Sequence, residues 1–428
     1  MKYLFLNILL LFVIENLYSQ TGWITQASGV TTNLNSVKFI NSQTGWCVGD
    51  SGVILNTVNR GLNWTQQFSG YDNNLNSIHF TSINTGYVAG NSGLILKTTD
   101  SGNNWMILSF NSNNNLTSIN FVNDSTGFTG GTNGNGRSEN DGTPKKFIYK
   151  TTNYGNLWDS IDCKKAFLIT YVYFQNSNLG WIVNFPGVIG GSELLKTTDS
   201  GFNWHSSFFT NQSIFSFVFV DSLYGWISSY NSVSVKTIFR TTNGGINWIS
   251  EFPGTGIRIN SFHFINRLKG WGAGENRIIQ STTNSGINWI NQTSLNPGVN
   301  YRSVYFTDSL TGWVVGDSGI ILKTTTGGVL TNFSNISSEI PDKFSLSQNF
   351  PNPFNPRTII NYQLSMFSFV SIKVYDVLGN EVVELVNEKQ NAGSYSVEFD
   401  GSGFASGIYF YRLETGSFVD TKKMTLIK

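Results

Sequence analysis

Three arginines whose positions follow an internal repeat are the side chains best suited to bind a ligand. Arg258 and Arg302 stand just before or within the start of a predicted strand, and Arg277 lies in a predicted turn of the sixth repeat unit. Guanidinium groups form paired hydrogen bonds with planar oxyanions, so this group predicts a site for a carboxylate, a sulfate or an acidic protein surface. Arg137, within an insertion at 130–146, is a fourth candidate. The alternative is a set of solvated loop charges, partly neutralised by Glu275.

The sequence carries no pattern typical of catalysis, of a metal centre or of a bound cofactor. It contains three histidines but no Cys-x-x-Cys, no phosphate-binding loop and no Gly-x-Ser-x-Gly elbow. His79 and His263 occupy equivalent positions in predicted strands, so the repeat by itself explains them. We therefore expect no catalytic residue, no metal and no cofactor, and we favour a binding protein over an enzyme.

Composition favours an exported all-β protein. Charged residues make up only 12% of the chain, aromatic residues 14%, and there are 44 glycines, a mixture typical of short strands joined by tight turns. A net charge of +1 argues against a nucleic-acid partner. Residues 1–19 contain one basic residue and an apolar run that is too short to span a bilayer, which predicts a signal peptide. The mature chain is expected to have no transmembrane segment.

A pair of glycine and an aromatic residue recurs along most of the chain. Successive copies are 41 to 53 residues apart, enough for one four-stranded blade of a β-propeller. Each unit contains four short apolar or alternating runs, termed strands A to D, bounded by Gly, Asn, Ser or Asp. The seven copies are Gly45-Trp46, Gly86-Tyr87, Gly127-Phe128, Gly180-Trp181, Gly225-Trp226, Gly270-Trp271 and Gly312-Trp313.

A second motif, Thr-x-Asp/Asn-x-Gly-x-x-Trp, lies between strands C and D. In a tight turn the Asp or Asn side chain accepts backbone N–H groups, glycine allows a positive φ, and tryptophan buries its ring against the sheet. The motif resembles the Asp-box of bacterial neuraminidase repeats, which implies a turn-forming rather than a catalytic role. Its residues are Asn59, Asp100, Asn153, Asp199, Asn243 and Asn284, followed by Trp64, Trp105, Trp158, Trp204, Trp248 and Trp289.

The same resemblance leaves a secreted glycoside hydrolase of the Asp-box propeller type as the alternative function. Such enzymes need two carboxylates, or a tyrosine with an acidic partner, across a cleft. The early Arg-Ile-Pro signature of neuraminidases is absent from this chain. We therefore expect a scaffold that binds an envelope or extracellular protein or glycan.

The seventh unit has no closing tryptophan of its own, and the N-terminus is predicted to supply one. The segment 23–26 with 35–39 matches 64–67 with 76–80, so Trp23 belongs to a strand D that closes the last blade. The fold class is therefore all-β, with a seven-bladed β-propeller over residues 20–332 closed by an N-terminal outer strand. This pattern resembles the photosystem II assembly-factor-like propellers, which implies a scaffold role.

Strand direction predicts where the candidate ligand-binding residues lie. Alternating strands place all B–C turns and D–A connections at one face of the ring. Arg258, Arg277 and Arg302, together with the insertions 130–146 and 185–191, are therefore expected at the same face.

A second domain is predicted over residues 344–428, after a linker at 333–343, because charged residues and prolines become frequent there. Alternating runs at 358–364, 369–376, 393–400, 407–415 and 418–426 indicate a small antiparallel, Ig-like β-sandwich. The segments NFPNPFNP, VYDVLG and ASGIYFYRL resemble the type A sorting domain of the type IX secretion system. The resemblance implies its translocon as a partner, passage through the periplasm, and a secreted or outer-membrane surface location. We expect a monomer.

Overall fold

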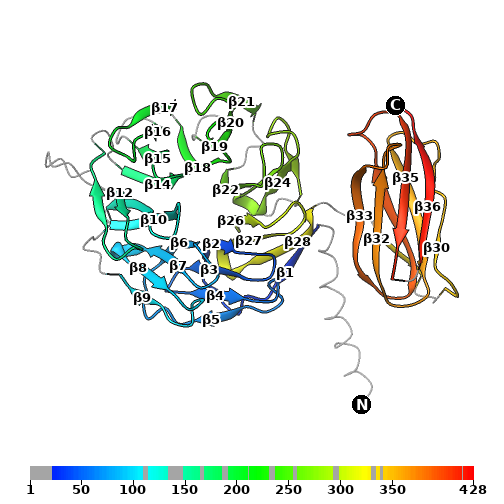
Figure 1. Cartoon of the computed structure of the whole chain (residues 1–428), viewed down its shortest axis with the longest axis horizontal. Helices are drawn as coiled ribbons and strands as arrows, with labels where there is room; N and C mark the ends of the chain where they lie inside the picture. The colour runs from blue at the N-terminus through cyan, green and yellow to red at the C-terminus, as the bar shows by residue number, and fades with distance from the viewer. Residues whose placement is uncertain are drawn as a thin grey trace, which may run out of the picture. The chain divides into compact units, whose positions relative to one another are not determined.

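The computed structural model describes an all-β chain that separates into two compact units, Met1–Gly328 and Val329–Lys428 (Figure 1). The predicted signal peptide and Arg137 lie outside the described residues. Within the described ranges, no helix is long and apolar enough to cross a membrane. These ranges are 22–108, 114–133, 148–163, 168–185, 191–210, 212–230, 237–253, 258–292, 298–328, 334–337, 341–416 and 418–428.

The first unit contains seven four-stranded antiparallel sheets in its described residues, numbered blades 1 to 7 in the order of their inner strands. The inner strands A are β2 (Leu34–Phe39), β6 (Leu75–Phe80), β10 (Asn114–Phe121), β14 (Leu168–Phe174), β18 (Ser213–Phe219), β22 (Ile259–Phe264) and β26 (Tyr301–Phe306). Strands B are β3 (Gly45–Gly49), β7 (Gly86–Gly90), β11 (Gly127–Asn133), β15 (Gly180–Phe185), β19 (Gly225–Tyr230), β23 (Gly270–Gly274) and β27 (Gly312–Gly316).

The outer half of each blade consists of strands C and D. Strands C are β4 (Ile54–Thr57), β8 (Ile95–Thr98), β12 (Ile148–Thr151), β16 (Ser192–Thr197), β20 (Thr237–Thr241), β24 (Ile279–Thr282) and β28 (Ile321–Gly328). Strands D are β5 (Thr65–Gln67), β9 (Met106–Ile107), β13 (Asp159–Ile161), β17 (His205–Thr210), β21 (Ile249–Pro253), β25 (Ile290–Asn291) and, for blade 7, β1 (Gly22–Gln26). Single 3-10 turns, η1 (Asn91–Gly93), η2 (Glu275–Arg277) and η3 (Asp317–Gly319), join B to C in blades 2, 6 and 7.

The N-terminal strand closes the ring, as the sequence predicts. β1 pairs antiparallel with β28, so blade 7 has the strand order β1-β28-β27-β26. Trp23 of β1 is buried and meets Phe306 edge-on, with ring centroids 5.7 Å apart. Its Nε1 donates to Oε1 of Gln292 in the connection after blade 6 at 3.2 Å. The two ends of the propeller segment are therefore joined by a hydrogen-bonded ladder and a buried ring.

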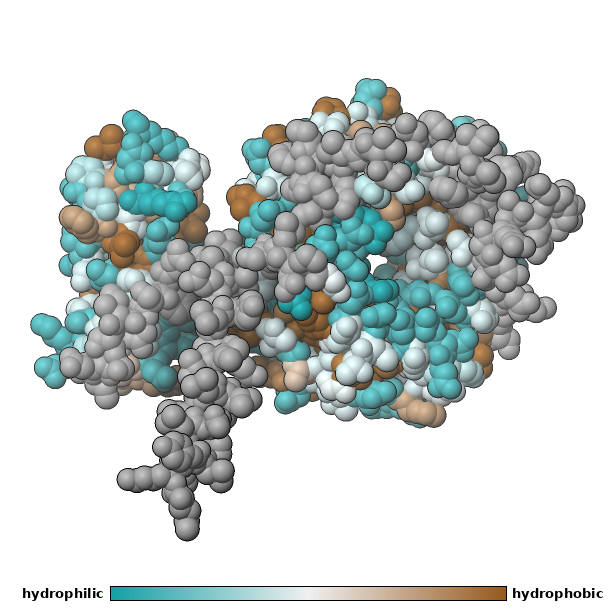
Figure 2. Space-filling view, turned by 180° about the vertical axis from the view of Figure 1, so that it is seen from behind, coloured by the Kyte–Doolittle hydropathy of each residue, from teal (hydrophilic) through white to brown (hydrophobic). Residues whose placement is uncertain are grey.

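The seven inner strands are arranged around the centre of the ring (Figure 1). The space-filling view shows an opening through the centre of the ring, with hydrophilic residues at its edge (Figure 2). Serines near the middle of several inner strands accept backbone N–H groups of the next inner strand. Ser77 accepts from Ile119 at 3.1 Å, and Ser303 accepts from Val37 at 3.2 Å, which links blade 7 to blade 1.

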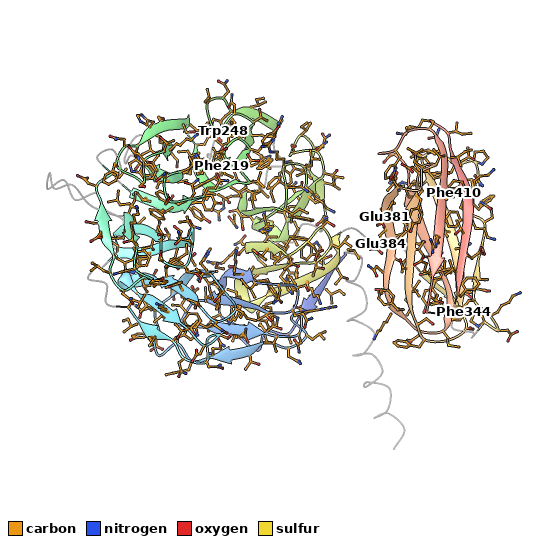
Figure 3. All side chains as sticks on the ribbon, in the orientation of Figure 1. Phe219, Trp248, Phe344, Glu381, Glu384 and Phe410 are labelled. Atoms are coloured by element: carbon orange, nitrogen blue, oxygen red, sulfur yellow. The ribbon has the colours of Figure 1, made fainter. Side chains whose placement is uncertain are left out.

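Each inner strand ends in a phenylalanine that packs between two blades. In blade 6, Phe264 stacks on Trp226 of blade 5 with centroids 3.6 Å apart and meets Trp289 edge-on at 5.9 Å. A Cβ on Gly270 would lie 2.3 Å from the Phe264 ring, which explains the glycine of the repeat. Phe219 and Trp248, labelled in Figure 3, form the same edge-on pair in blade 5. We call these rings the aromatic belt, whose phenylalanines are Phe39, Phe80, Phe121, Phe174, Phe219, Phe264 and Phe306.

The second unit is a β-sandwich of two four-stranded sheets. One has the order β29 (Ser334–Ser337), β34 (Gly393–Asp400), β31 (Arg357–Leu364), β30 (Ser345–Leu346). The other has the order β33 (Glu381–Gln390), β32 (Ser368–Tyr375), β35 (Gly407–Glu414), β36 (Val419–Leu426). The sequence did not predict β29, β30 or β33, and β29 lies within the segment expected to be a linker. Charged residues interrupt the apolar pattern of β33, which made this strand hard to recognise in the sequence. Two of them, Glu381 and Glu384 (Figure 3), form ion pairs with Lys373 of β32 at 2.8 and 3.6 Å.

The asparagine that begins the NFPNPFNP segment is buried in this sandwich. The Nδ2 of Asn349 donates to Thr358 Oγ1 at 2.9 Å and to the Pro351 carbonyl at 3.0 Å. Its backbone N–H donates to the Tyr411 hydroxyl at 2.7 Å, and that hydroxyl donates to the Ser347 carbonyl. Because buried polar groups need partners, this network fixes the segment against both sheets.

Candidate functional site

The B–C turns of blades 6, 7, 1 and 2 form a hydrogen-bonded rim, which we call the crown. The backbone N–H at each turn tip donates to the Oδ1 of an asparagine just before, or at the start of, the inner strand of the next blade. The four bonds are Ser51 to Asn74 at 3.1 Å, Ser92 to Asn115 at 3.1 Å, Asn276 to Asn300 at 3.3 Å and Ser318 to Asn33 at 3.2 Å. Each bond crosses a blade boundary, so hydrogen bonds within the protein hold the crown turns in place.

A second set of carboxamides ties the crown to the inner strands. Asn35 Nδ2 donates to Asp50 Oδ1 and to the Leu75 carbonyl, both at 2.9 Å. Asn76 of blade 2 makes the equivalent bonds to the Asn91 side chain and to the Leu116 carbonyl. The repeat thus places one polar side chain at the start of each of these inner strands.

Arg302 takes the place of that asparagine in blade 7. Its Nε pairs with Asp317 Oδ1 of the B–C turn at 2.6 Å, and its Nη1 donates to Asn35 Oδ1 of blade 1 at 3.1 Å. The guanidinium therefore bridges blades 7 and 1. It is held in place, and a carboxylate of its own blade offsets its charge.

Arg258 takes the position that asparagines hold in blades 1, 2, 3 and 7. Its Nε pairs with Glu275 at 3.2 Å and donates to Asn260 Oδ1 at 2.9 Å. Its guanidinium lies over the ring of Phe215 in blade 5, 4.3 Å from the centroid, a geometry suited to cation–π attraction. Like Arg302, it bridges two blades and is matched with a carboxylate.

Arg277 stands where the other described crown turns have glycine. Its φ is 61°, beside 70° at Gly52, 71° at Gly93 and 72° at Gly319. Left-handed backbone is unfavourable for a residue with a Cβ, by about 1–2 kcal/mol. Burial raises the pKa of nearby Tyr301 to about 12, and the Arg277 charge opposes that rise. The chain therefore carries a cation at a position where glycine is the less strained residue.

The structure brings the three predicted arginines to one end of neighbouring blades 6 and 7. Two of them, Arg258 and Arg302, are paired with Glu275 and Asp317, so the net positive charge is smaller than the sequence suggested. The sequence missed the asparagine bracing of the crown. The sequence signal for this bracing is an Asn-x-Asn or Asn-Asn pattern just before or at the start of the inner strands, at residues 33–35, 73–74 and 114–115.

The Asp-box residues lie at the other end of the blades, in the C–D turns. In blade 2, Asp100 Oδ1 accepts the Thr98 hydroxyl at 2.8 Å and the Asn104 N–H at 2.9 Å. Hydrogen bonds from Asn104, and then from Thr98, hold the pKa of Asp100 below its ordinary value, and bonds from Asn203 and Thr197 do the same for Asp199. This geometry shapes a turn.

The sequence identified His79 and His263 as equivalent repeat positions but did not predict that they belong to a mostly polar group of inner-strand side chains. The residue before the belt phenylalanine is Lys38, His79, Asn120, Tyr173, Val218, His263 or Tyr305, depending on the blade. Lys38 Nζ lies 4.7 Å from the centre of the Tyr305 ring, although 267 positions separate the two residues in the sequence. These residues are adjacent only because the blades form a ring.

The fold and these sites define a seven-bladed β-propeller followed by a β-sandwich. Residues 15–113 match the family model of photosynthesis system II assembly factor YCF48. Residues 348–428 match that of the secretion system C-terminal sorting domain, so the sandwich marks a chain delivered by the type IX secretion system to the cell surface or the extracellular space. Among curated protein sequences, none matches the chain.

Solved structures share the propeller fold at low sequence identity. YCF48 bound to D1 peptide aligns with a TM-score of 0.57 and 18% identity, over 71% of this chain and 97% of that one. YCF48 from Cyanidioschyzon merolae gives 0.57 and 17%, over 71% and 98%. PorZ, a surface component of the type IX secretion system of Porphyromonas gingivalis, gives 0.55 and 12%, over 91% of this chain and 59% of PorZ.

Proposed function

We propose that this chain is an exported binding scaffold that presents the crown of its propeller to a protein or glycan carrying an anionic group. The crown is the observation that carries the proposal. Its turn tips, its asparagines and two cross-blade arginines are held by hydrogen bonds within the protein. A surface ordered in advance loses little conformational entropy on binding, which favours recognition.

The backbone conformation of Arg277 also supports the crown as the binding surface. Non-glycine residues in left-handed backbone often mark functional positions, because the strain persists only where something compensates for it. Two similar propellers give precedents, since one YCF48 structure holds a bound D1 peptide and PorZ is a surface component of the type IX secretion system of Porphyromonas gingivalis. We infer recognition, and not catalysis, for the present propeller.

The lowered pKa values of three aspartates in the propeller favour binding over glycoside hydrolysis. A glycosidase needs a general acid whose pKa is raised. Hydrogen bonds hold the pKa of Asp100 and Asp199 down. Burial alone would raise the pKa of Asp221, but this pKa is also lowered, because hydrogen bonds from Arg267 and from two backbone N–H groups, with the Arg267 charge, together outweigh the burial. These side chains suit fixed acceptors of hydrogen bonds.

Capture with an engineered crown tests the proposal. The mature chain, immobilised, would be exposed to envelope proteins and to a glycan array, beside a variant with Arg258, Arg277 and Arg302 replaced by alanine. Arg267→Ala is the matched control. Arg267 is also ion-paired, with Asp221, but it lies at the opposite end of the blades. We expect the triple variant to lose binding by about tenfold or more at low salt and by less at high salt, since salt screens exposed charges.

Unchanged binding by the triple variant at low ionic strength would remove the arginines from the site. Equal losses in the triple variant and in Arg267→Ala would indicate a nonspecific charge effect.

Removing the sandwich tests the delivery half of the proposal. A chain that ends after residue 344 keeps all seven blades, so we expect it to fold and to remain in the periplasm. Fractionation that finds the shortened chain outside the cell at the normal level would contradict this expectation.

A further inference from the structure

We propose that the axial channel of the propeller binds a small oxyanion, such as a carboxylate or phosphate group, beside Lys38. The observation is a half-buried lysine of inner strand β2 that the ring closure places among polar side chains of three other blades. The ring is open at its centre (Figure 2). This site is separate from the crown. It lies toward the opposite end of the inner strands, one residue before the aromatic belt.

Lys38 belongs to β2 of blade 1, and its neighbours come from both sides of the ring. Its ammonium lies over the ring of Tyr305 in blade 7. Its charge also acts on His79 of blade 2 and on His263 of blade 6, lowering the pKa of both. His263 in turn lies beside Tyr305, with ring centroids 4.5 Å apart. One cation therefore stands within electrostatic reach of three neighbouring inner strands.

Within the described part of the chain, Lys38 forms no ion pair and no side-chain hydrogen bond. The crown arginines differ, since Glu275 and Asp317 match Arg258 and Arg302. A half-buried ammonium without a carboxylate is the group that an incoming anion would stabilise most.

His79 and Tyr305 supply neutral hydrogen-bond donors near the ammonium. Burial first, and the Lys38 charge second, lower the pKa of His79 and of His263 to about 3, so both imidazoles are neutral at pH 7. A neutral imidazole carries one N–H donor, and that of His263 already bonds the Phe306 backbone. The donors that remain near the ammonium are the His79 N–H and the Tyr305 hydroxyl. Donors around one positive charge among half-buried side chains form an environment suited to an oxyanion, because the local dielectric is lower than that of water.

Histidine resonances allow a direct test, because the chain contains only His79, His205 and His263. His205 is exposed at the start of outer strand β17 and serves as an internal control. The mature chain from residue 20 would be titrated at pH 7 with sodium acetate and with inorganic phosphate, following the imidazole Cε1–H signals by NMR. We expect saturable shifts of His79 and His263 with a common midpoint, and no saturable shift of His205.

Substitution of Lys38 distinguishes specific anion binding at this site from a general effect of added salt. Lys38→Met keeps most of the side-chain volume without the charge, and we expect it to weaken binding by about tenfold or more, the effect of removing one good charge–charge contact. Lys38→Arg should retain binding. Lys97→Met is the matched control, since Lys97 also lies over tyrosine rings, those of Tyr87 and Tyr154, but away from the channel.

Two ligand sources share this chemistry, and the titration distinguishes them. If the anion is a free small molecule, acetate or phosphate should bind as well as N-acetyl-dialanine. If it is the carboxyl end of a peptide, N-acetyl-dialanine should bind more tightly than acetate, and its C-terminal amide should not bind. Parallel shifts of all three histidines, or undiminished binding by Lys38→Met, would overturn the proposal. So would the absence of saturable shifts at about 100 mM acetate or phosphate, a hundred times a millimolar Kd.

Discussion

The aromatic belt and the crown join the same blades by different means. In the belt, all seven blade boundaries have one arrangement, a phenylalanine stacked 3.5–3.9 Å from an aromatic ring of the preceding blade. In the crown, the residue that bridges blades is asparagine at one boundary and arginine at another. The difference indicates that the belt provides stability, while the crown and the channel are free to vary and to acquire ligands.

Deleting the closing strand should have the largest effect on stability. Removal of residues 22–26 takes Trp23 out of the belt and breaks the ladder with β28, at a cost on the order of several kcal/mol. The measurement is thermal unfolding followed by circular dichroism, with the chain that begins at residue 20 as the reference. A deleted chain that melts at the reference temperature would show that the belt does not need its seventh tryptophan.

Two phenylalanines of the inner strands compare belt and crown directly. Phe264→Ala removes a ring stacked on Trp226 and packed against Trp289, so we expect a loss of about 3–5 kcal/mol. Phe215→Ala removes the ring beneath Arg258 at the crown, and we expect a loss below about 1 kcal/mol. Urea unfolding of both variants measures the difference. Similar losses would mean that the crown is as important for stability as the belt.

The channel histidines should make stability depend on pH. Their pKa of about 3 in the folded protein lies below the ordinary 6.5, with Lys38 and Tyr305 as the facing groups. Between pH 6.5 and 3 the unfolded chain binds protons that the folded chain does not, so the free energy of unfolding falls as pH falls. Each imidazole contributes up to about 1.4 kcal/mol per pH unit.

Asparagine replacements test this dependence, because blade 3 carries Asn120 at the same position. Melting between pH 7 and 5 should change less in the His79→Asn/His263→Asn variant than in the wild type. The exposed His205→Asn control should behave as the wild type. Equal slopes in the double variant and the wild type would show that the imidazoles titrate normally in the folded protein.

Glycine at the strained crown position should have the smallest effect on stability, and an opposite effect on binding. Arg277→Gly introduces the residue that the equivalent turns have at Gly52, Gly93 and Gly319, and we expect it to stabilise the protein by about 1 kcal/mol. Capture of an anionic partner should weaken. A variant that is less stable than the wild type would show that Arg277 contributes more contacts than its backbone costs.

The repeat made most of the propeller predictable. Glycine, phenylalanine and tryptophan recur at fixed spacing because each blade needs a ring between two sheets, a glycine beneath it and an edge-on tryptophan. The match of Trp23 to the missing seventh tryptophan predicted ring closure for the same reason. In the sandwich, β33 was missed because its apolar residues are interrupted by Glu381 and Glu384, which partner Lys373.

By itself the sequence determined the number of blades, the closing strand, the turn chemistry of the Asp-boxes and the sorting domain. All of these depend on residues close together in the chain or on a repeat that can be counted. Only the tertiary structure decided which charges are matched. Glu275 and Asp317 reach their arginines through hairpins. Lys38 lies over Tyr305 and acts electrostatically on His79 and His263 because ring closure brings four inner strands together. Spacing along the chain does not predict this proximity, since the distances between side chains of different blades are set by the radius of the ring.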